Sequence, residues 1–276
     1  MRGDILIKVM IKPLRILGSP LSIQNQLFLR LSQCGIAALF IIFYWNYLQI
    51  KKYALKELDN NVSSASHLIV NDIEHTLQQR INDLLTLSQS PLFVDHFKNR
   101  QYRLFQEATI YRGEIERFLS DFLGRSGVYT EALYFDSTGR EICRIDGGIA
   151  AGAAPLPHRE KIFRHSLKLP QGQYWVSDEP MLFPGVGTVV YLAKTLSDLN
   201  GEVIGVLARG YNLKTLEGIV NQARLGYGGT ITLEDSHDRV LVGHRVGFEK
   251  PLEKISSLKH QPWKVRVVVD AERALK

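Results

Sequence analysis

The stretch Leu133-Tyr-Phe-Asp-Ser-Thr-Gly-Arg-Glu-Ile-Cys-Arg144 decides the fold, because it has the pattern of a β-hairpin. Residues 132–135 form an apolar and aromatic run that is typical of a strand. Asp136 and Gly139 then mark a turn, since an aspartate side chain bonds to the following backbone and glycine readily adopts positive φ. Residues 140–145 are expected to return as the second strand. This hairpin predicts an antiparallel sheet.

More β structure is expected toward the C-terminus. A short helix at residues 158–167 precedes three predicted strands, and a helix at residues 212–222 precedes three more. The strands are predicted at residues 173–177, 188–196 and 202–209, and then at 229–234, 239–242 and 263–269. Asn200-Gly201 is a strong hairpin signal between the second and third of them.

A short motif occurs twice. The turn that begins at Asp136 reads Asp-Ser-Thr-Gly-Arg, and the turn that begins at Asp235 reads Asp-Ser-His-Asp-Arg. Both lie between short predicted strands. Two matched hairpins, each at the start of an antiparallel region, predict a duplicated module.

The N-terminal side of the hairpin is predicted to be helical. One helix is expected at residues 105–123. Before it, residues 51 to about 98 are expected to form one long helix, because apolar residues recur there at spacings of three and four. Neither glycine nor proline interrupts this stretch before Ser90-Pro91. Helices followed by antiparallel strands predict an α+β fold.

Residues 31–50 form an uncharged segment flanked by Arg30 and Lys51. About 20 helical residues span the roughly 30 Å hydrocarbon core of a bilayer, so we predict a transmembrane helix. Interfacial aromatic residues cluster at one end: Tyr44, Trp45 and Tyr47. A cleaved signal peptide fits poorly because no small-x-small site follows. A buried core helix is the remaining alternative.

The charge distribution favours a topology and argues against nucleic-acid binding. Of the formal net charge of +6, +4 lies in residues 1–30 and +2 after residue 50. A basic arm beside an apolar segment indicates a cytoplasmic N-terminus, with residues 51–276 on the other side. The body carries no basic stripe, and no stacking aromatics interleave with the basic arm, so no nucleic-acid partner is expected.

Four stretches together resemble the double Cache (tandem PAS-like) sensor domains of bacterial receptors. The first hairpin is one of them, and the others are residues 79–92, Gly172-Gln-Tyr-Trp-Val-Ser177 and Asn200-Gly-Glu-Val-Ile-Gly-Val-Leu207. Such domains precede histidine kinases, diguanylate cyclases and chemoreceptors. The resemblance covers roughly residues 31–276.

The resemblance implies a domain organisation. It predicts a cytoplasmic basic arm, a transmembrane helix, a long signalling helix, a distal PAS-like module and a smaller proximal one, at residues 1–30, 31–50, 51–100, 101–215 and 216–276. It implies a receptor in a bacterial inner membrane that forms a homodimer and senses a ligand in the distal module. A second transmembrane helix is expected where the sequence stops, so we expect the chain to be a fragment.

Ligand contacts are predicted from cations and polar groups in or beside the distal sheet. Converging guanidinium groups suit an anionic ligand such as a carboxylate or phosphate. The candidates are Arg144, Arg164, Tyr174, Ser177, Tyr191, Lys194 and Arg209. Arg164 matches the arginine of the family's amino-acid motif, but its aromatic pair and the aspartate are missing, so an amino-acid ligand is not supported.

No catalytic, metal or cofactor motif is present in the sequence. It contains neither a phosphate loop nor a His-Glu-x-x-His pattern, and its eight histidines lack acidic or cysteine partners at ligand spacing. We therefore expect no cofactor and no enzyme. Three functions stay open, in this order: a small-molecule sensor, a membrane-anchored domain that senses a protein partner, and an extracytoplasmic hydrolase.

Overall fold

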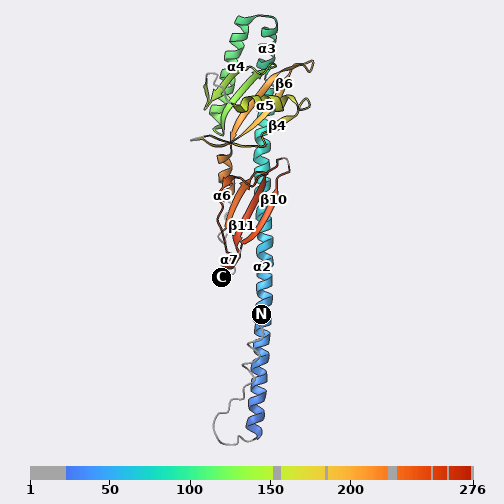
Figure 1. Ribbon diagram of the computed structural model, residues 1–276, viewed down its shortest axis with the longest axis vertical. Helices are drawn as coiled ribbons and strands as arrows, with labels where there is room; N and C mark the ends of the chain where they lie inside the picture. The colour runs from blue at the N-terminus through green and yellow to red at the C-terminus, as the bar shows by residue number, and fades with distance from the viewer. Residues whose placement is uncertain are drawn as a thin grey trace. The chain divides into compact units, whose positions relative to one another are not determined.

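The computed structural model describes residues 23–151, 157–183, 186–222, 229–249, 251–259 and 261–274. Its contacts divide the chain into two compact units, Met1–Ala54 and Leu55–Lys276. The fold is α+β, as predicted, with a long apolar helix near the N-terminus followed by antiparallel sheets (Figure 1).

Helix α2 (Ile23–Ser88) contains the apolar segment of the first unit. Its most apolar window has a mean hydropathy of 1.8, and none of that window is buried. Large side chains there are well exposed, such as Phe40 (69%), Ile41 (68%) and Phe43 (70%). In the part of the chain that the structure describes, this helix is long and apolar enough to cross a membrane.

The predicted long helix ends earlier than expected. α2 stops at Ser88, and a new helix, α3 (Pro91–Gln101), begins three residues later, so residues 51–98 are not one helix. Ser90 is extended (φ −61°, ψ 129°), because a proline disfavours the helical conformation of the residue before it. Helix α4 (Phe105–Ser126) then covers the predicted helix and ends at Gly127, whose φ is 62°.

A seven-stranded antiparallel sheet forms the core of the first half of unit Leu55–Lys276. The strand order is β3-β2-β1-β7-β6-β4, and β5 pairs with β6. The strands are β1 (Tyr129–Asp136), β2 (Glu141–Asp146), β3 (Ile149–Ala150), β4 (Tyr174–Val176), β5 (Met181–Phe183), β6 (Gly187–Ser197) and β7 (Val203–Asn212). The predicted first hairpin is confirmed as β1 and β2, and Asn200-Gly201 lies in the turn between β6 and β7.

The two faces of this sheet pack against different helices. One face packs against α5 (Pro157–Leu167), which lies across the strands in Figure 1, and this apolar cluster includes Leu133, Trp175 and Ala208. The opposite face joins a larger core with α2, α3 and α4. We call these the α5 face and the helix face. Strand alternation decides to which face each side chain points.

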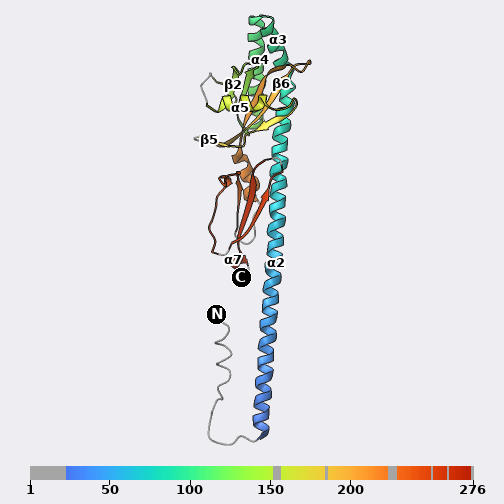
Figure 2. The ribbon, with the colours of Figure 1, turned by 45° about the vertical axis from the view of Figure 1, so that its right-hand side comes forward.

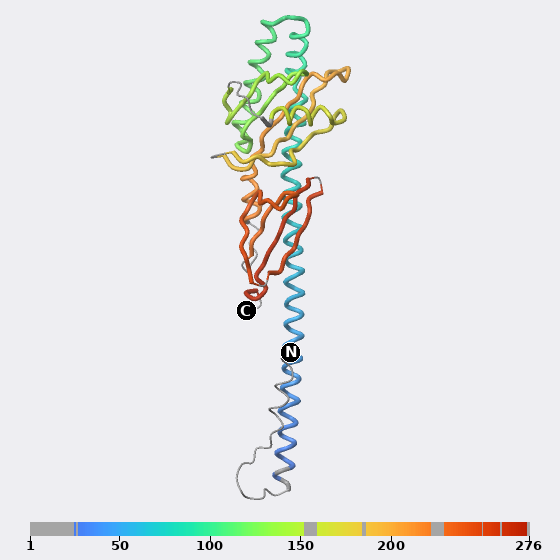
Figure 3. Tube along the Cα trace, in the orientation of Figure 1, coloured from blue at the N-terminus to red at the C-terminus, as the bar shows by residue number. Residues whose placement is uncertain are grey.

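A second, four-stranded sheet follows in the order β10-β11-β8-β9. The chain enters it through η1 (Leu213–Leu216) and α6 (Glu217–Gln222), as the trace in Figure 3 shows. Its strands are β8 (Gly229–Glu234), β9 (Val240–Gly243), β10 (Pro251–Ser257) and β11 (Lys264–Asp270), followed by the short helix α7 (Ala271–Ala274). The boundaries of the two predicted modules, 101–215 and 216–276, stay predictions.

Strand β10 of the second sheet lies beside α2 (Figures 1 and 2). Ser66 Oγ donates to Ser256 Oγ at 2.8 Å, and Lys254 Nζ lies 3.0 Å from Asp59 Oδ1. The same helix supplies Leu77, Ile81 and Leu84 to the large core. Within unit Leu55–Lys276, therefore, α2 contacts the second sheet and shares its core with the first.

The repeated Asp-Ser-x-x-Arg motif forms the same turn in both sheets. Asp136 Oδ1 accepts from the backbone N of Thr138 and of Arg140, both at 3.0 Å. Asp235 Oδ1 accepts from the equivalent residues, His237 at 2.8 Å and Arg239 at 2.9 Å. The aspartate side chain thus satisfies the turn's backbone donors in each hairpin.

Candidate functional site

The seven residues predicted to bind a ligand do not converge. Three lie on the α5 face, three on the helix face and one on the outside of α5. On the α5 face, Arg144 lies opposite Leu133, and the backbone N of Ser177 donates to Tyr191 O. The expectation of one cluster of converging cations is therefore corrected, because alternating side chains of neighbouring strands point to opposite faces of the sheet.

Arg209, Lys194 and Tyr174 belong to the helix face. Lys194 pairs across the strands with both Tyr174 and Leu207, and Leu207 and Tyr174 pack in the large core. Burial lowers the pKa of Lys194. These three side chains are separated by the sheet itself from the residues on the α5 face.

The Arg209 guanidinium is held by aromatic rings. It is fully buried, with its Cζ 3.3 Å from the ring centroid of Tyr129 and 4.4 Å from that of Phe122. None of its nitrogens has a hydrogen-bond partner among the described residues. Burial lowers its pKa to about 10, and the Tyr129 ring offsets part of the cost of burying the charge.

Helix α5 presents a different arginine to the sheet from the predicted one. The Arg164 side chain is 69% exposed and pairs with Glu160 on the same helix. Arg159 is 9% exposed, and it shares the inward face of α5 with Ile162 and Ser166, both fully buried. Residues 159, 162 and 166 follow the spacing of one helical face, while residue 164 falls on the opposite side.

Arg159 was missed although the sequence held a signal for it. Ile162 and Phe163 are the apolar pair of α5, and a helical face that contains them also contains residue 159. The match of Arg164 to a family motif pointed to the outward side instead. Helical phase was the better guide here, because the buried side of an amphipathic helix is set by its apolar residues.

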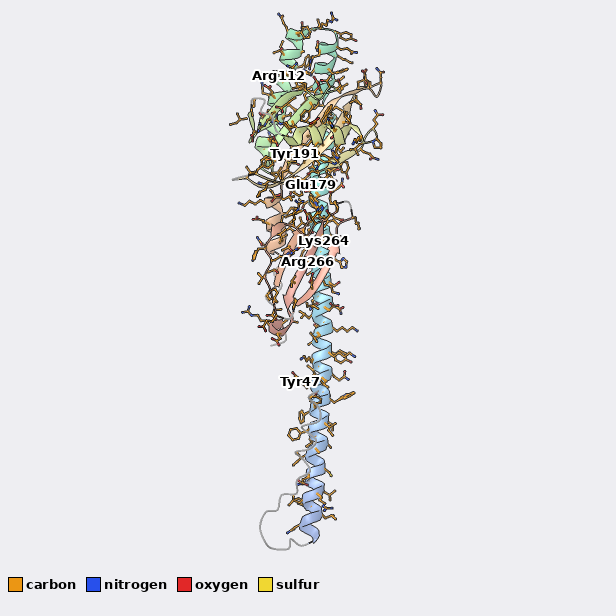
Figure 4. All side chains as sticks on the ribbon, in the orientation of Figure 1. Tyr47, Arg112, Glu179, Tyr191, Lys264 and Arg266 are labelled. Carbon is orange, nitrogen blue, oxygen red and sulfur yellow. The ribbon has the colours of Figure 1, made fainter. Side chains whose placement is uncertain are left out.

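A buried charge cluster occupies the α5 face. We define it as Glu131 of β1, Glu141 and Arg144 of β2, Arg159 of α5 and Tyr191 of β6. The side chains of its four charged residues are between 6% and 14% exposed, and the whole of Tyr191 is buried. Figure 4 labels Tyr191 within the first sheet. Four separate elements therefore bring polar groups to one place.

Ion pairs connect the residues of the cluster. Arg159 Nη1 pairs with Glu141 Oε2, and Arg144 Nε lies 3.5 Å from Glu131 Oε2. Arg144 also pairs through Nη2 with Asp146 Oδ2 at 2.7 Å, at the exposed margin. The Tyr191 hydroxyl donates a short hydrogen bond to Glu131 Oε1.

A β-bulge brings both residues of β2 to this face. Glu141 and Arg144 are an odd number of residues apart, so regular alternation would place them on opposite faces. The β1–β2 register shifts between Tyr134 and Phe135, and Glu141 then lies opposite Phe135, which belongs to the α5 cluster. The bulge thus places a carboxylate where Arg159 reaches it.

Burial shapes the protonation of the cluster. Burial raises the pKa of Glu141, and the neighbouring Arg159 and Arg144 oppose that rise. Burial and the Glu131 carboxylate raise the pKa of Tyr191, so its hydroxyl keeps its proton and serves as a donor. The cluster therefore presents a phenol donor and two guanidinium groups beside two carboxylates.

Arg159 retains free donor capacity. Its Nε and Nη2 are buried and have no hydrogen-bond partner in the described part of the chain. An arginine presents its donors as a planar fork that suits a carboxylate. A buried donor without an acceptor costs free energy, so these two nitrogens mark a place where an additional acceptor would be stabilised.

Ser177 has a local structural role. Its Oγ accepts from the backbone N of Tyr191 at 3.0 Å, and its own N donates to Tyr191 O at 2.9 Å. These bonds tie the end of β4 to β6 beside the cluster. Among the described residues no group of three His, Cys, Asp or Glu side chains has the geometry of a metal site.

The fold is shared with solved structures of sensory domains. The ligand-binding domain of a Pseudomonas aeruginosa amino-acid chemoreceptor in complex with GABA aligns with a TM-score of 0.55 at 15% identity, over 77% of this chain and 99% of that one. The sensory domain of a Campylobacter jejuni chemoreceptor with isoleucine bound gives a TM-score of 0.62 at 11% identity, over 82% and 98%.

A third structure extends the likeness beyond chemoreceptors. A domain of a sensory box/GGDEF family protein from Vibrio parahaemolyticus aligns with a TM-score of 0.58 at 14% identity, over 82% of this chain and 99% of that one. No protein-family model and no curated protein sequence matches the chain. The chain has the fold of these sensory domains, which are not catalytic ones, and the predicted double Cache (tandem PAS-like) resemblance is confirmed at the level of fold.

Proposed function

We propose that residues 51–276 are the extracytoplasmic sensing module of a transmembrane receptor. In this proposal a small molecule binds on the α5 face of the first sheet, and α2 carries the signal to a bacterial inner membrane. The fold supports it, since two of the similar domains described above belong to chemoreceptors and hold GABA or isoleucine. The module acts as a homodimer without catalysis.

The buried charge cluster is the observation that carries the proposal. A buried ion pair rarely stabilises a fold more than well-packed apolar residues would, because desolvation offsets the Coulombic gain. Most of the surrounding α5 face is apolar, with Leu133, Ala193 and Ala208 fully buried. Charges retained at such a cost favour recognition of a ligand over packing.

The donors of the cluster define the ligand's chemistry. Arg159 offers two nitrogens without a partner in the described part of the chain, and Arg144 lies on the same face. A carboxylate is the group that best matches such donors. We therefore propose a small anionic ligand whose carboxylate contacts Arg159, with Arg144, Tyr191 and Ser177 at its margin. Arg164, Tyr174, Lys194 and Arg209 are not part of this proposed site.

A thermal-shift screen of the full chain in detergent tests the proposal. A ligand that binds only the native state raises the melting temperature. Small carboxylates, amines, amino acids, sugars and nucleotides form the panel. A carboxylate should stabilise the wild type and stabilise Arg159→Gln much less, while Arg164→Gln, a change on the exposed side of the same helix, should respond like the wild type.

A flat response of the folded wild type across the panel would contradict small-molecule sensing. A hit that stabilises Arg159→Gln as strongly as the wild type would place the ligand away from the cluster. Because Arg159 and Arg164 lie on one helix and differ in burial, the pair separates loss of a contact from a general effect of removing charge.

A protein partner is the second candidate function, and one surface favours it. Four large apolar side chains are exposed around the turn between α3 and α4: Tyr102 (69%), Leu104 (45%), Phe105 (65%) and Ile110 (65%). Exposed apolar patches often mark interaction sites. A specific protein captured by the wild type and lost with Phe105→Ser and Ile110→Ser, together with a flat thermal-shift screen, would favour this function.

A further inference from the structure

We propose that Glu141 is a built-in occupant of the carboxylate subsite at Arg159, which a ligand's carboxylate must displace. The existence of a ligand rests on the proposed function, whereas the resident carboxylate is argued from the Arg159–Glu141 pair alone. Without a ligand, the Glu141 side chain fills the subsite, so ligand binding exchanges one carboxylate for another.

Glu141 occupies only part of the Arg159 guanidinium. Arg159 Nη1 contacts Glu141 Oε2, while Nε and Nη2 of the same guanidinium have no hydrogen-bond partner in the described residues. Glu141 therefore engages one nitrogen of the fork and leaves two unused. A carboxylate free to orient itself can satisfy two donors at once, which is the stronger arrangement.

A β-bulge in the backbone directs Glu141 toward Arg159. Glu141 reaches this face only through the β-bulge at the start of β2, whereas a regular strand would turn it toward the helix face. A bulge re-aims a side chain at the expense of ladder hydrogen bonds. Occupation of the Arg159 subsite by the Glu141 carboxylate explains why β2 has this bulge.

Burial of the pair favours an anion beside Arg159. The pair is buried, with 10% of the Arg159 side chain and 11% of the Glu141 side chain exposed. A buried guanidinium left alone would be costly, so an empty site requires a resident anion. Glu141 supplies it, and the second pair, Arg144 with Glu131, supplies the same neutrality beside it.

Chemical rescue tests the inference. Glu141→Ala removes from the side chain the heavy atoms of one acetate ion and leaves Arg159 without its partner. Acetate should then bind to Arg159 and raise the melting temperature of this variant, by about 3–5 °C for each tenfold excess over its dissociation constant. The full chain in detergent is followed by tryptophan fluorescence, since Trp175 lies on the same face.

Matched controls isolate the subsite. Acetamide has the shape of acetate without its charge, and sodium chloride reproduces the ionic strength; neither should rescue. Glu179→Ala removes a carboxylate that pairs with Lys161, also on α5, but that pair is exposed, so acetate should have no effect there. Adding Arg159→Gln to Glu141→Ala should abolish the response to acetate.

The outcomes separate this inference from the proposed function. An acetate response that is equal in Glu141→Ala, Glu179→Ala and wild type, or absent in all three, would overturn the inference. If Glu141→Ala does not fold, Glu141→Gln replaces it: its neutral amide competes less well, so acetate should stabilise it more than the wild type, and an equal response would overturn the inference. Rescue by acetate with a flat ligand screen of the wild type would uphold the occupied subsite and reject the sensor.

Discussion

At the scale of single residues, burial decides what each charged or polar group can do. Arg159 and Arg209 are both buried arginines, yet one faces carboxylates and the other faces aromatic rings. The first has chemistry suited to exchange of an anionic partner. The second lies over the rings of Tyr129 and Phe122, on the side of the sheet that packs against the helices.

His96 predicts a pH dependence of stability. It is a residue of α3 and 3% exposed, with its Nδ1 3.4 Å from the hydroxyl of Tyr134 in β1. Burial, assisted by Arg100, lowers its pKa from 6.5 to about 4. Because the unfolded chain binds the proton more readily, the His96 contribution to stability is complete above pH 6.5. It is lost as the pH falls from 6.5 to 4.

The expected loss is at most about 3 kcal/mol, since each pKa unit corresponds to about 1.4 kcal/mol. Urea unfolding of wild type and His96→Gln between pH 4 and 7 measures it. The variant should show a flatter dependence over this interval, whereas the exposed His237 replaced in the same way should leave the dependence unchanged. Identical pH profiles for His96→Gln and wild type would contradict the assignment.

At the scale of elements, the close spacing of β1 and β7 depends on a glycine in β7. Gly205 of β7 lies between Asp136 of β1 and Leu196 of β6. A Cβ at this position would lie 2.2 Å from Phe135 O and 2.9 Å from the Tyr134 ring. The backbone of this central strand cannot move far enough to relieve the overlap without breaking its hydrogen bonds to the neighbouring strands.

Gly205→Ala is therefore expected to destabilise the protein by more than about 2 kcal/mol, through overpacking of the β1–β7 pair. Gly113→Ala is the matched control: Gly113 lies inside α4, and nothing lies within 4 Å of its added Cβ. That change should stabilise the helix by about 0.5–1 kcal/mol. Chemical unfolding measures both, and similar values for the two substitutions would refute the proposed close approach.

The two sheets differ in how completely their buried charged groups are hydrogen-bonded. In the second sheet, the buried Glu234 carboxylate accepts from Arg245 Nε at 2.9 Å, Arg266 Nε at 3.0 Å and Thr232 Oγ1 at 2.9 Å. Figure 4 shows Lys264 and Arg266 together on that sheet. This carboxylate is fully satisfied, whereas Arg159 of α5 has two nitrogens without a partner in the described part of the chain.

At the scale of the whole molecule, α2 predicts membrane retention. Its apolar window is exposed throughout, which a soluble protein would rarely tolerate over such a length. The full chain should stay in the membrane fraction through a carbonate wash. Ile41→Arg combined with Ile42→Arg should release it, because each arginine at the centre of a membrane helix costs about 2.5–3.5 kcal/mol.

Tyr53→Arg provides the control for that experiment. It lies on the same helix and is 70% exposed, but beyond the predicted span of residues 31–50. It should not alter fractionation. Release of the wild type by carbonate, or equal retention of the double arginine variant and the wild type, would argue that α2 does not cross a membrane.

The sequence by itself determined the elements that depend on local chemistry. The turn residues at Asp136 and Asp235, the apolar runs of β1 and β7, and the uncharged segment before Lys51 each act over a few neighbouring residues. The α+β class, both first hairpins and the apolar helix were predicted for that reason. Strands β3, β5 and β10 were missed, because they are defined by their partners more than by their own pattern.

Tertiary structure alone decided which residues meet. The bulge that aims Glu141 at the α5 face and the position of α5 over the sheet are not local properties of any segment. They brought Arg159 and Glu131 into the candidate site and left Arg164 and Arg209 outside it. A one-residue change of register reverses the face of every later side chain in a strand, so composition and spacing predict the sheet while only its packing fixes the site.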